Sequence, residues 1–261
     1  MELVAALLTA LVGLFSPAGA LPEVALEAAI EDQIHSAEAL AVRIDNRPSY
    51  NLLSGRVDRV RIAGRGVYLT PELRVALVDI ETDAVDLAAG PLLQGRVRLE
   101  QPLQFVARIV IDTEDVNQAL RSPGIAQAVQ NIGIGALGSA AGGMQQADLV
   151  DPRLDLAAGN QFRLRGMLRE QGTDNELDLE AAFGLSLENG AQLSIEDPRL
   201  VADGVEFPAE LLLPLIQGVN QQLGLRSLEP AGITARLLTL ETTPDTLEAI
   251  AFVRLEPSVF P

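Results

Sequence analysis

The stretch NELDLEAAFGLSLENG, residues 175–190, decides the architecture of the second half of the chain. From Leu177 to Leu187, apolar residues occupy every second position, and acidic residues alternate with them at the start of the run. A period of two is typical of a strand with one buried and one solvated face. Asn189-Gly190, which ends the run, is the strongest short-range signal for a β-hairpin. The stretch therefore predicts an antiparallel sheet.

The strand pattern just before this stretch carries the opposite charge. In QFRLRGMLRE, residues 161–170, Arg163, Arg165 and Arg169 alternate with apolar residues. Opposite charges that lie directly across a strand pair attract each other. We therefore expect these two strands to be neighbours, with an ion-paired outer face and an apolar inner face.

Two further patterns extend the β-rich character of the second half. The runs 232–241 and 247–256 are apolar on both sides and predict a hairpin closed over TTPDT. The tetrapeptide DPRL occurs twice, at 151–154 and at 197–200, and an extended run follows it each time. We interpret the two copies as similar starts of two strands.

The stretch GRVDRVRIAGRG, residues 55–66, begins the strand pattern of the first half. Three of its arginines fall on one face of an extended chain, and Val60 and Ile62 fall on the other. PLQFVARIVID, residues 102–112, predicts another strand, with Phe105 and Ile109 on its apolar face. It continues into DTEDVNQAL, where we expect Asp112 or Thr113 to cap a short helix.

The arginines have two possible roles, and strand register decides between them. A second apolar strand, 73–82, follows the first after a short turn. With a three-residue loop, Arg61 lies opposite Glu81 and Arg59 lies opposite Asp83, so the arginines form ion pairs. A shift of one residue leaves the arginines unpaired and free for a phosphate group. The middle of the chain holds as many acidic residues as arginines, which favours the ion-paired register.

Two segments have the periodicity of amphipathic helices. The first, residues 22–40, repeats apolar residues every four positions and contains His35, which we interpret as a residue on the helix surface. The second helix covers residues 208–224, and Gly224 suits its C-terminal end. The apolar stripe of this second helix consists of Leu212, Ile216, Val219 and Leu223.

The first twenty residues, MELVAALLTALVGLFSPAGA, form an apolar segment without a positive charge. Ala18-Gly19-Ala20 fits the cleavage site of a secretory signal peptide, although the usual basic n-region is missing. A retained anchor and a buried helix are the alternatives, because about 20 apolar residues suffice to span a bilayer. We predict a separate segment 1–20, followed by a single domain over 21–261.

Composition excludes several classes of function. The chain has no Cys and no Lys, and His35 is its one histidine, so thiolate sites and the Walker A lysine have no residues to build on. The formal net charge of −17 and an aromatic content of 3% disfavour nucleic-acid binding. GIGALG, residues 133–138, matches G-x-G-x-x-G but follows a helical pattern, so we interpret it as a flexible loop. We expect no metal and no cofactor. A hydrolase built on paired carboxylates ranks third, behind the two functions given at the end of this section.

Three consecutive blocks resemble the LmeA-like phospholipid-binding family, long catalogued as a domain of unknown function. The blocks are VRIDNRPSYNLLSGRVDRVRIAGRGVYL (42–69), LRVALVDIETDAVDL (73–87) and PLQFVARIVIDTEDVNQALRSP (102–123). The resemblance covers most of residues 22–256. It implies an α+β protein in which a long, curved antiparallel β-sheet wraps around one or two amphipathic helices, similar to tubular lipid-binding folds. It also implies a bacterial cell-envelope protein that binds phospholipid without catalysing a reaction.

We therefore expect a non-enzymatic phospholipid-binding or lipid-transfer protein of the cell envelope, which holds acyl chains in an apolar groove and works at a membrane surface. The candidate lining residues, chosen by strand parity and helix periodicity, are Val60, Ile62, Phe105, Ile109, Leu212, Ile216 and Val219. The candidate head-group residues are Arg59, Arg61 and Arg65. The alternative is an envelope scaffold or assembly factor that binds protein partners through its apolar faces.

Overall fold

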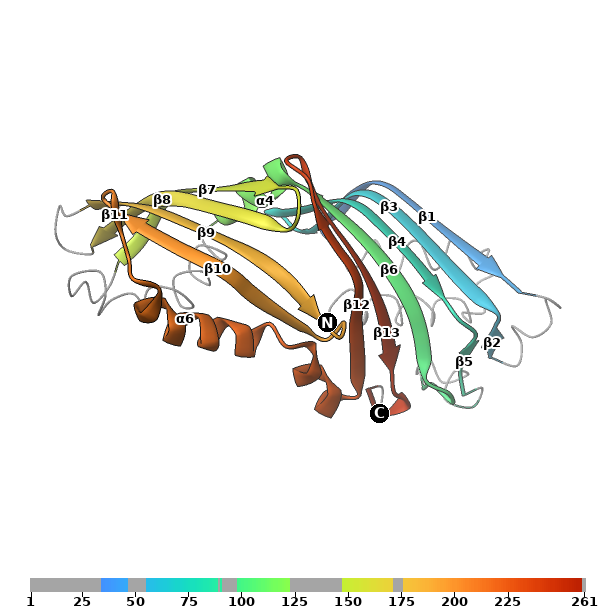
Figure 1. Ribbon diagram of the computed structural model, residues 1–261. Helices are drawn as coiled ribbons and strands as arrows, with labels where there is room; N and C mark the ends of the chain where they lie inside the picture. The colour runs from blue at the N-terminus through green and yellow to red at the C-terminus, as the bar shows by residue number, and fades with distance from the viewer. Residues whose placement is uncertain are drawn as a thin grey trace. The chain divides into compact units, whose positions relative to one another are not determined.

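The computed structural model describes residues 34–46, 55–88, 90, 98–122, 147–170 and 176–259, which are mostly in strands (Figure 1). The described elements are β1 (Ser36–Asp45), β2 (Arg56–Val57), β3 (Arg59–Thr70), β4 (Leu73–Thr82), β5 (Val85–Asp86), β6 (Leu103–Asp112), α4 (Thr113–Leu120), β7 (Ala147–Ala157), β8 (Gln161–Glu170), β9 (Glu176–Glu188), β10 (Gln192–Ala202), β11 (Val205–Glu206), α6 (Ala209–Gln222), η2 (Leu225–Ala231), β12 (Ile233–Thr242), β13 (Thr246–Leu255) and η3 (Pro257–Val259).

The chain divides into two compact units. The first unit comprises Met1–Val110, Leu225–Thr239 and Ala249–Pro261, and the second comprises Ile111–Gly224 and Leu240–Glu248. A six-stranded sheet, in the order β1-β3-β4-β6-β13-β12, lies mostly in the first unit. A five-stranded sheet, in the order β11-β10-β9-β8-β7, lies in the second. The antiparallel architecture is confirmed, but the described strands form separate sheets rather than one continuous sheet.

The predicted strands of the first half are confirmed, and β4 coincides with the predicted run 73–82. In β3, Val60 is fully buried and Ile62 is 5% exposed, whereas Arg59 and Arg65 are exposed. The register continues this alternation across the sheet, because Ile62 lies opposite Ile80 and Ile80 lies opposite Ala107. The buried face of the sheet is therefore built from aliphatic side chains.

The alternation of β3 changes at Gly66, which has a positive φ of 53°. A Cβ added to Gly64 would lie 2.6 Å from Cγ2 of Val67, so Val67 lies on the same face as Gly64. In a regular strand, positions whose numbers differ by an odd amount, such as 64 and 67, lie on opposite faces. The left-handed backbone at Gly66, which glycine adopts without steric cost, therefore moves Val67 onto the buried face.

The second unit contains the predicted meander. The β8–β9 and β9–β10 pairs are antiparallel, and Asn189 and Gly190 form the turn between β9 and β10 with φ of 50° and 67°. Two consecutive positive φ values are what a type I′ hairpin turn requires. The prediction from 175–190 is therefore confirmed at both the strand and the turn. The predicted hairpin of β12 and β13 is confirmed as well.

The two DPRL copies lie inside strands, so their interpretation as strand starts was wrong. Asp151 in β7 and Asp197 in β10 have φ of 48° and 46°. The strand register shifts between Val150 and Arg153, and in β10 it shifts between Glu196 and Arg199. Proline has no N–H to give to the ladder, and aspartate tolerates the left-handed region better than most residues. DPRL is therefore a repeated β-bulge motif.

The two helix predictions have different outcomes. Residues 208–224 are confirmed as a helix by α6, whose C-cap residue is Leu223 rather than Gly224. Residues 36–40 belong to β1, so the helix predicted for 22–40 was wrong over this part. The exposed His35 precedes β1 and donates its backbone N–H to the Tyr68 carbonyl. Pairing of this segment with β3 outweighs its local preference for helix.

The helix after β6 is confirmed as α4, but its predicted side-chain cap was wrong. Asp112 is the N-cap residue and makes no capping hydrogen bond through its side chain. The Thr113 hydroxyl donates to the Pro244 carbonyl instead. Among the described residues, no helix is long and apolar enough to cross a membrane. The segments 1–20, 22–33, 124–146 and the GIGALG motif lie outside the described residues.

Candidate functional site

Four of the candidate lining residues lie together on one face of the six-stranded sheet. Val60, Ile62 and Phe105 are buried, and Ile109 is half-buried. Phe105 lies opposite Thr82 in the register. We call this side of the sheet the β3–β6 face; it consists of Val60, Ile62, Val78, Ile80, Phe105, Ala107 and Ile109.

Thr82 is the polar residue at the end of the β3–β6 face, and it is 3% exposed. Its hydroxyl oxygen accepts a hydrogen bond of 2.9 Å from the Val60 N–H. A buried backbone N–H without a partner would cost about 1–3 kcal/mol, so this contact explains why threonine is tolerated there. The Thr82 hydroxyl therefore has its hydrogen-bond partner within the sheet, and the other side chains of the β3–β6 face are apolar.

The other three candidates lie on α6 in the second unit. Leu212 is 3% exposed and packs among Leu168, Leu179 and Leu200 of β8, β9 and β10. Ile216 packs against the same cluster, and Val219 is half-buried. The helix lies along β10 (Figure 1). The seven candidates therefore form two sets, one in each unit.

The five-stranded sheet has an apolar face as well. The helix α6 packs against the part of this face that lies at β10. We call this apolar face the β7–β10 face; it consists of Phe162, Leu168, Leu179, Phe183, Leu185, Ile195 and Leu200. The rings of Phe162 and Phe183 stack across the β8–β9 pair with their centroids 5.4 Å apart. Phe183, Leu185 and Ile195 are half-buried. These residues were not among the candidates, although the alternation in 175–190 already indicated a buried face.

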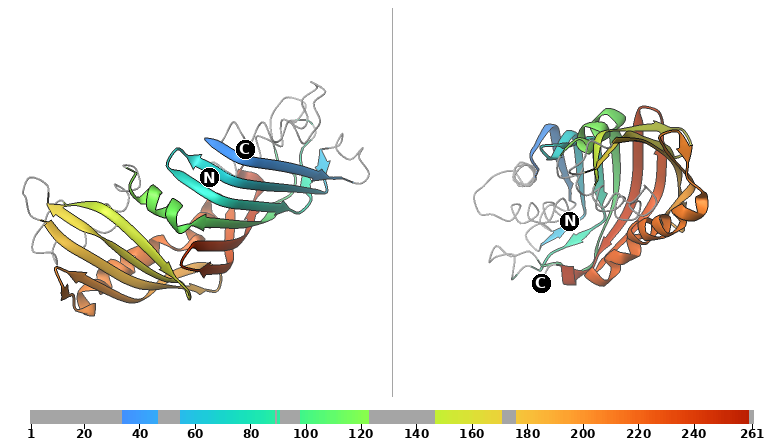
Figure 2. Two further views of the ribbon diagram at one scale, coloured as in Figure 1. Left: turned by 90° about the horizontal axis from the view of Figure 1, so that it is seen from above. Right: turned by 90° about the vertical axis from the view of Figure 1, so that its left-hand side faces the viewer.

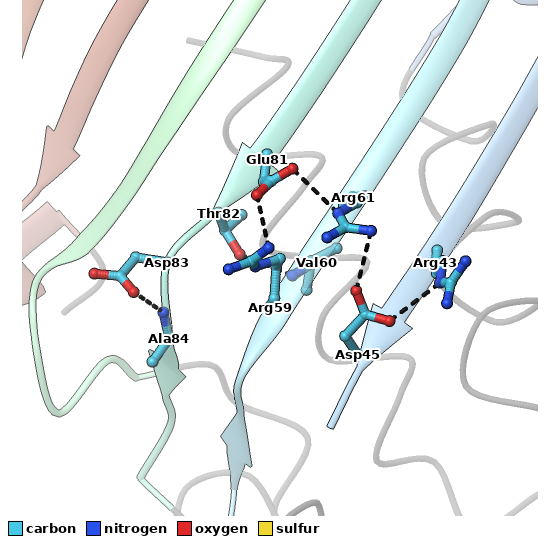
Figure 3. Close-up of polar contacts among 9 residues, drawn as sticks. All are labelled: Arg43, Asp45, Arg59, Val60, Arg61, Glu81, Thr82, Asp83 and Ala84. Carbon is cyan, nitrogen blue, oxygen red and sulfur yellow. Dashed lines mark hydrogen bonds and ion pairs between the residues drawn. The ribbon is translucent and has the colours of Figure 1, made fainter. Parts of the chain in front are cut away.

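Ion pairs join Arg59 and Arg61 of β3 to acidic residues of the neighbouring strands (Figure 3). Glu81 lies 3.0 Å from Arg59 and 3.1 Å from Arg61. Asp45 lies 3.3 Å from Arg61 and 3.1 Å from Arg43. The ion-paired register is therefore confirmed, and Arg61 lies opposite Glu81 as predicted.

The predicted pairing of Arg59 with Asp83 was wrong. Arg59 forms its ion pair diagonally with Glu81, and the Asp83 carboxylate accepts a hydrogen bond from the Ala84 N–H (Figure 3). Asp83 follows the end of β4, where the chain has left the β3–β4 ladder. The physical reason is therefore that strand pairing ends before the predicted partner is reached.

Arg65 differs from the other two arginines. It is exposed, it lies between Ala39 and Leu77 in the register, and it has no carboxylate partner in the described part of the chain. All three candidate head-group arginines lie on the face of the sheet opposite Val60 and Ile62. An acyl chain on the β3–β6 face is thus separated from these arginines by the sheet itself.

The outer face of the five-stranded sheet is charged and paired across strands, as predicted. Arg169 lies 2.6 Å from Glu176, and Arg163 lies 3.5 Å from Glu180. A hydrogen bond from the Arg165 guanidinium lowers the pKa of the Asp155 carboxyl group, although partial burial opposes this effect. No group of three acidic or histidine side chains among the described residues is arranged to hold a metal ion.

Both sheets thus have one apolar and one charged face, which defines an antiparallel β-sheet protein with broad, largely buried apolar faces. The chain belongs to the LmeA-like phospholipid-binding family, whose family model matches residues 16–252. The resemblance seen in the three sequence blocks is therefore confirmed. No curated protein and no solved structure matches the chain.

Proposed function

We propose that this protein binds phospholipid without catalysing a reaction and holds the acyl chains against its apolar faces. Membership of the phospholipid-binding family over residues 16–252 is the observation that carries the proposal. The β3–β6 face and the β7–β10 face supply the aliphatic surface that acyl chains need. Lipid sites in proteins are mostly apolar, with few polar groups.

Apolar contact, rather than ion pairing, accounts for the affinity in this proposal. Burial of a single methylene group contributes about 0.8 kcal/mol, so one long acyl chain far exceeds a surface ion pair at about 0.2–1 kcal/mol. Arg59 and Arg61 already have acidic partners on the charged face. Arg65 has no such partner in the described part of the chain, but it lies on the same charged face, so it could reach a head group only around the edge of the sheet.

The proposal includes the setting and the architecture that the resemblance implies. The apolar segment 1–20 supports export or tethering in the cell envelope, at a membrane surface. A wrap of the sheets around helices, as in tubular lipid-binding folds, would turn the apolar faces into a groove. We propose that residues 21–261 act together as one lipid-binding domain, which binds or transfers phospholipid.

Native mass spectrometry before and after organic extraction tests lipid binding. We expect a stoichiometric phospholipid that extraction removes. Ile109 and Val106 lie on opposite faces of β6, which makes them a matched pair: Ile109 is half-buried on the β3–β6 face and Val106 is 39% exposed on the charged face. I109Q should lose the lipid, and V106Q should keep it. Thermal unfolding of both variants shows whether they fold.

Two results would overturn the proposal. One is a purified protein without lipid that also fails to bind fluorescent or soluble short-chain phospholipids. The other is equal lipid content in folded I109Q and V106Q, which would overturn the part of the proposal that places acyl chains on the β3–β6 face. A stable protein partner in pull-downs, together with absence of lipid, would favour the scaffold alternative.

A further inference from the structure

Exposed apolar side chains gather at one end of the second unit. Val205, Leu211 and Leu213 are 66%, 56% and 53% exposed. The other exposed large apolar side chains in the described part of the chain are Leu238, at 56%, and Val106, at 39%. β11 and the start of α6 lie at the same end of this unit in both Figure 1 and Figure 2. We call Val205, Leu211 and Leu213 the α6 tip.

The geometry of α6 places its two leucines on the two flanks of the helix, because successive helix residues are about 100° apart and Leu212 faces the sheet. Leu212, which lies between them, is buried against the β7–β10 face and anchors this turn of the helix. Leu211 and Leu213 therefore cannot turn inward without pulling Leu212 out of the core. Side chains of a helix tilt toward its N-terminus, so both leucines lean toward the N-terminal end of α6, where β11 lies.

We propose that the α6 tip docks this protein on the surface of a phospholipid bilayer. The proposal rests on the proposed function, because a protein that collects phospholipid has to meet the bilayer that contains it. Burial of exposed leucines at the boundary between head groups and acyl chains stabilises interfacial binding in proportion to the apolar area buried. Glu210 is the one charged residue in α6. A stable protein interface needs about 800 Å² per partner, which three side chains do not supply.

The charge around the α6 tip determines which head-group charge the bilayer should have. Asp203, Glu206 and Glu210 lie within or beside it, and the sequence has no basic residue between Arg199 and Arg226. An anionic lipid surface would repel these carboxylates, and a second copy of the protein would bring the same three charges. The geometry therefore points to a bilayer of zwitterionic lipid.

Vesicle flotation of the full chain tests the docking. We expect binding to phosphatidylcholine vesicles and weaker binding to vesicles that contain phosphatidylglycerol, where added salt should raise binding by screening the repulsion. The double variant L211S/L213S should reduce partitioning by about tenfold, because two half-exposed leucines lose their transfer into the interface. L238S is the matched control, since Leu238 is also 56% exposed but lies in the first unit. It should bind vesicles like the unmodified protein.

A second measurement separates docking from lipid binding. Titration with a soluble short-chain phospholipid in the absence of vesicles should give the same affinity for L211S/L213S and the unmodified protein. Vesicle binding that is unchanged in L211S/L213S, or equally reduced in L238S, would overturn the docking proposal. Loss of a dimer by light scattering in L211S/L213S would overturn it too, because the patch would then face a second copy. Failure of the short-chain titration with intact vesicle binding would instead count against the proposed function.

Discussion

At the residue scale, Gly66 shows how one backbone angle organises a strand. Its φ is 53°, and an added Cβ would overlap the Glu38 carboxyl group. G66A should therefore lower the free energy of unfolding by about 1–3 kcal/mol, from backbone strain and from displacement of Glu38. Urea denaturation measures the change. Gly204 is the matched control, because its φ is 76° and a Cβ there meets no atom within 4 Å.

G204A should show the strain alone and cost less than G66A. Glu38 forms a 2.9 Å ion pair with Arg74, and the Cβ of G66A would push it away from that partner. Adding E38A to G66A should bring the cost closer to that of G204A. Equal costs for the two single variants would show that the contact with Glu38 does not matter.

Also at the residue scale, Asp155 should make stability depend on pH. The hydrogen bond from Arg165 lowers the pKa of the Asp155 carboxyl group in the folded state. A lowered folded-state pKa contributes stability above the unfolded pKa of about 3.9, and this contribution is lost as pH falls through the folded value. D155N should therefore be less stable than the unmodified protein at pH 6, with the difference shrinking below pH 4. Urea unfolding at several pH values measures it; a constant difference down to pH 3 would contradict this cause.

At the element scale, Leu212 is the most deeply buried of the α6 side chains that the structure describes, and it packs the helix against its sheet. The side chain is 3% exposed among Leu168, Leu179 and Leu200. L212A should lower the free energy of unfolding by about 2–5 kcal/mol, since it removes buried methyl groups and leaves a cavity. L211A is the control on the next residue, which is 56% exposed, and it should change stability by less than about 0.5 kcal/mol. Similar losses in both variants, measured by urea denaturation, would show that the helix is not anchored as described.

Elements with a strong local pattern were predictable from sequence, and elements decided by pairing were not. β4 follows from its continuous β-rich, apolar run, and the β9–β10 hairpin follows from alternation and from Asn189-Gly190. Residues 36–40 have a helical composition, yet they form β1, because the exposed edge of β3 offers backbone partners. The DPRL bulges were missed for a related reason, since a bulge exists only relative to the strand beside it.

At the scale of the whole molecule, bound phospholipid should stabilise the folded chain. A ligand that binds only the folded state adds about 2.7 kcal/mol at a concentration of 100 Kd. Extraction of the lipid should therefore lower the Tm, and added phospholipid should restore it. Differential scanning calorimetry measures both steps. I109Q serves as the control that should show no shift on lipid addition, and a Tm independent of lipid in the unmodified protein would contradict the prediction.

The residues of the candidate site also divide into those predicted by local pattern and those decided by strand pairing. Strand parity alone placed Val60 with Ile62 on one face of β3 and Phe105 with Ile109 on one face of β6, because side chains of a strand alternate whatever its neighbours are. That the two pairs lie on the same side of the sheet follows from the register. Pairing of Arg61 with Glu81 needed the register, and the partner of Arg59 needed the end of the ladder at Thr82. Composition and local period depend on the nearest residues in the chain, so sequence is enough for them. The separation of the candidates into two units, the bulges and the exposed α6 tip depend on contacts between distant segments, which only the folded chain brings together.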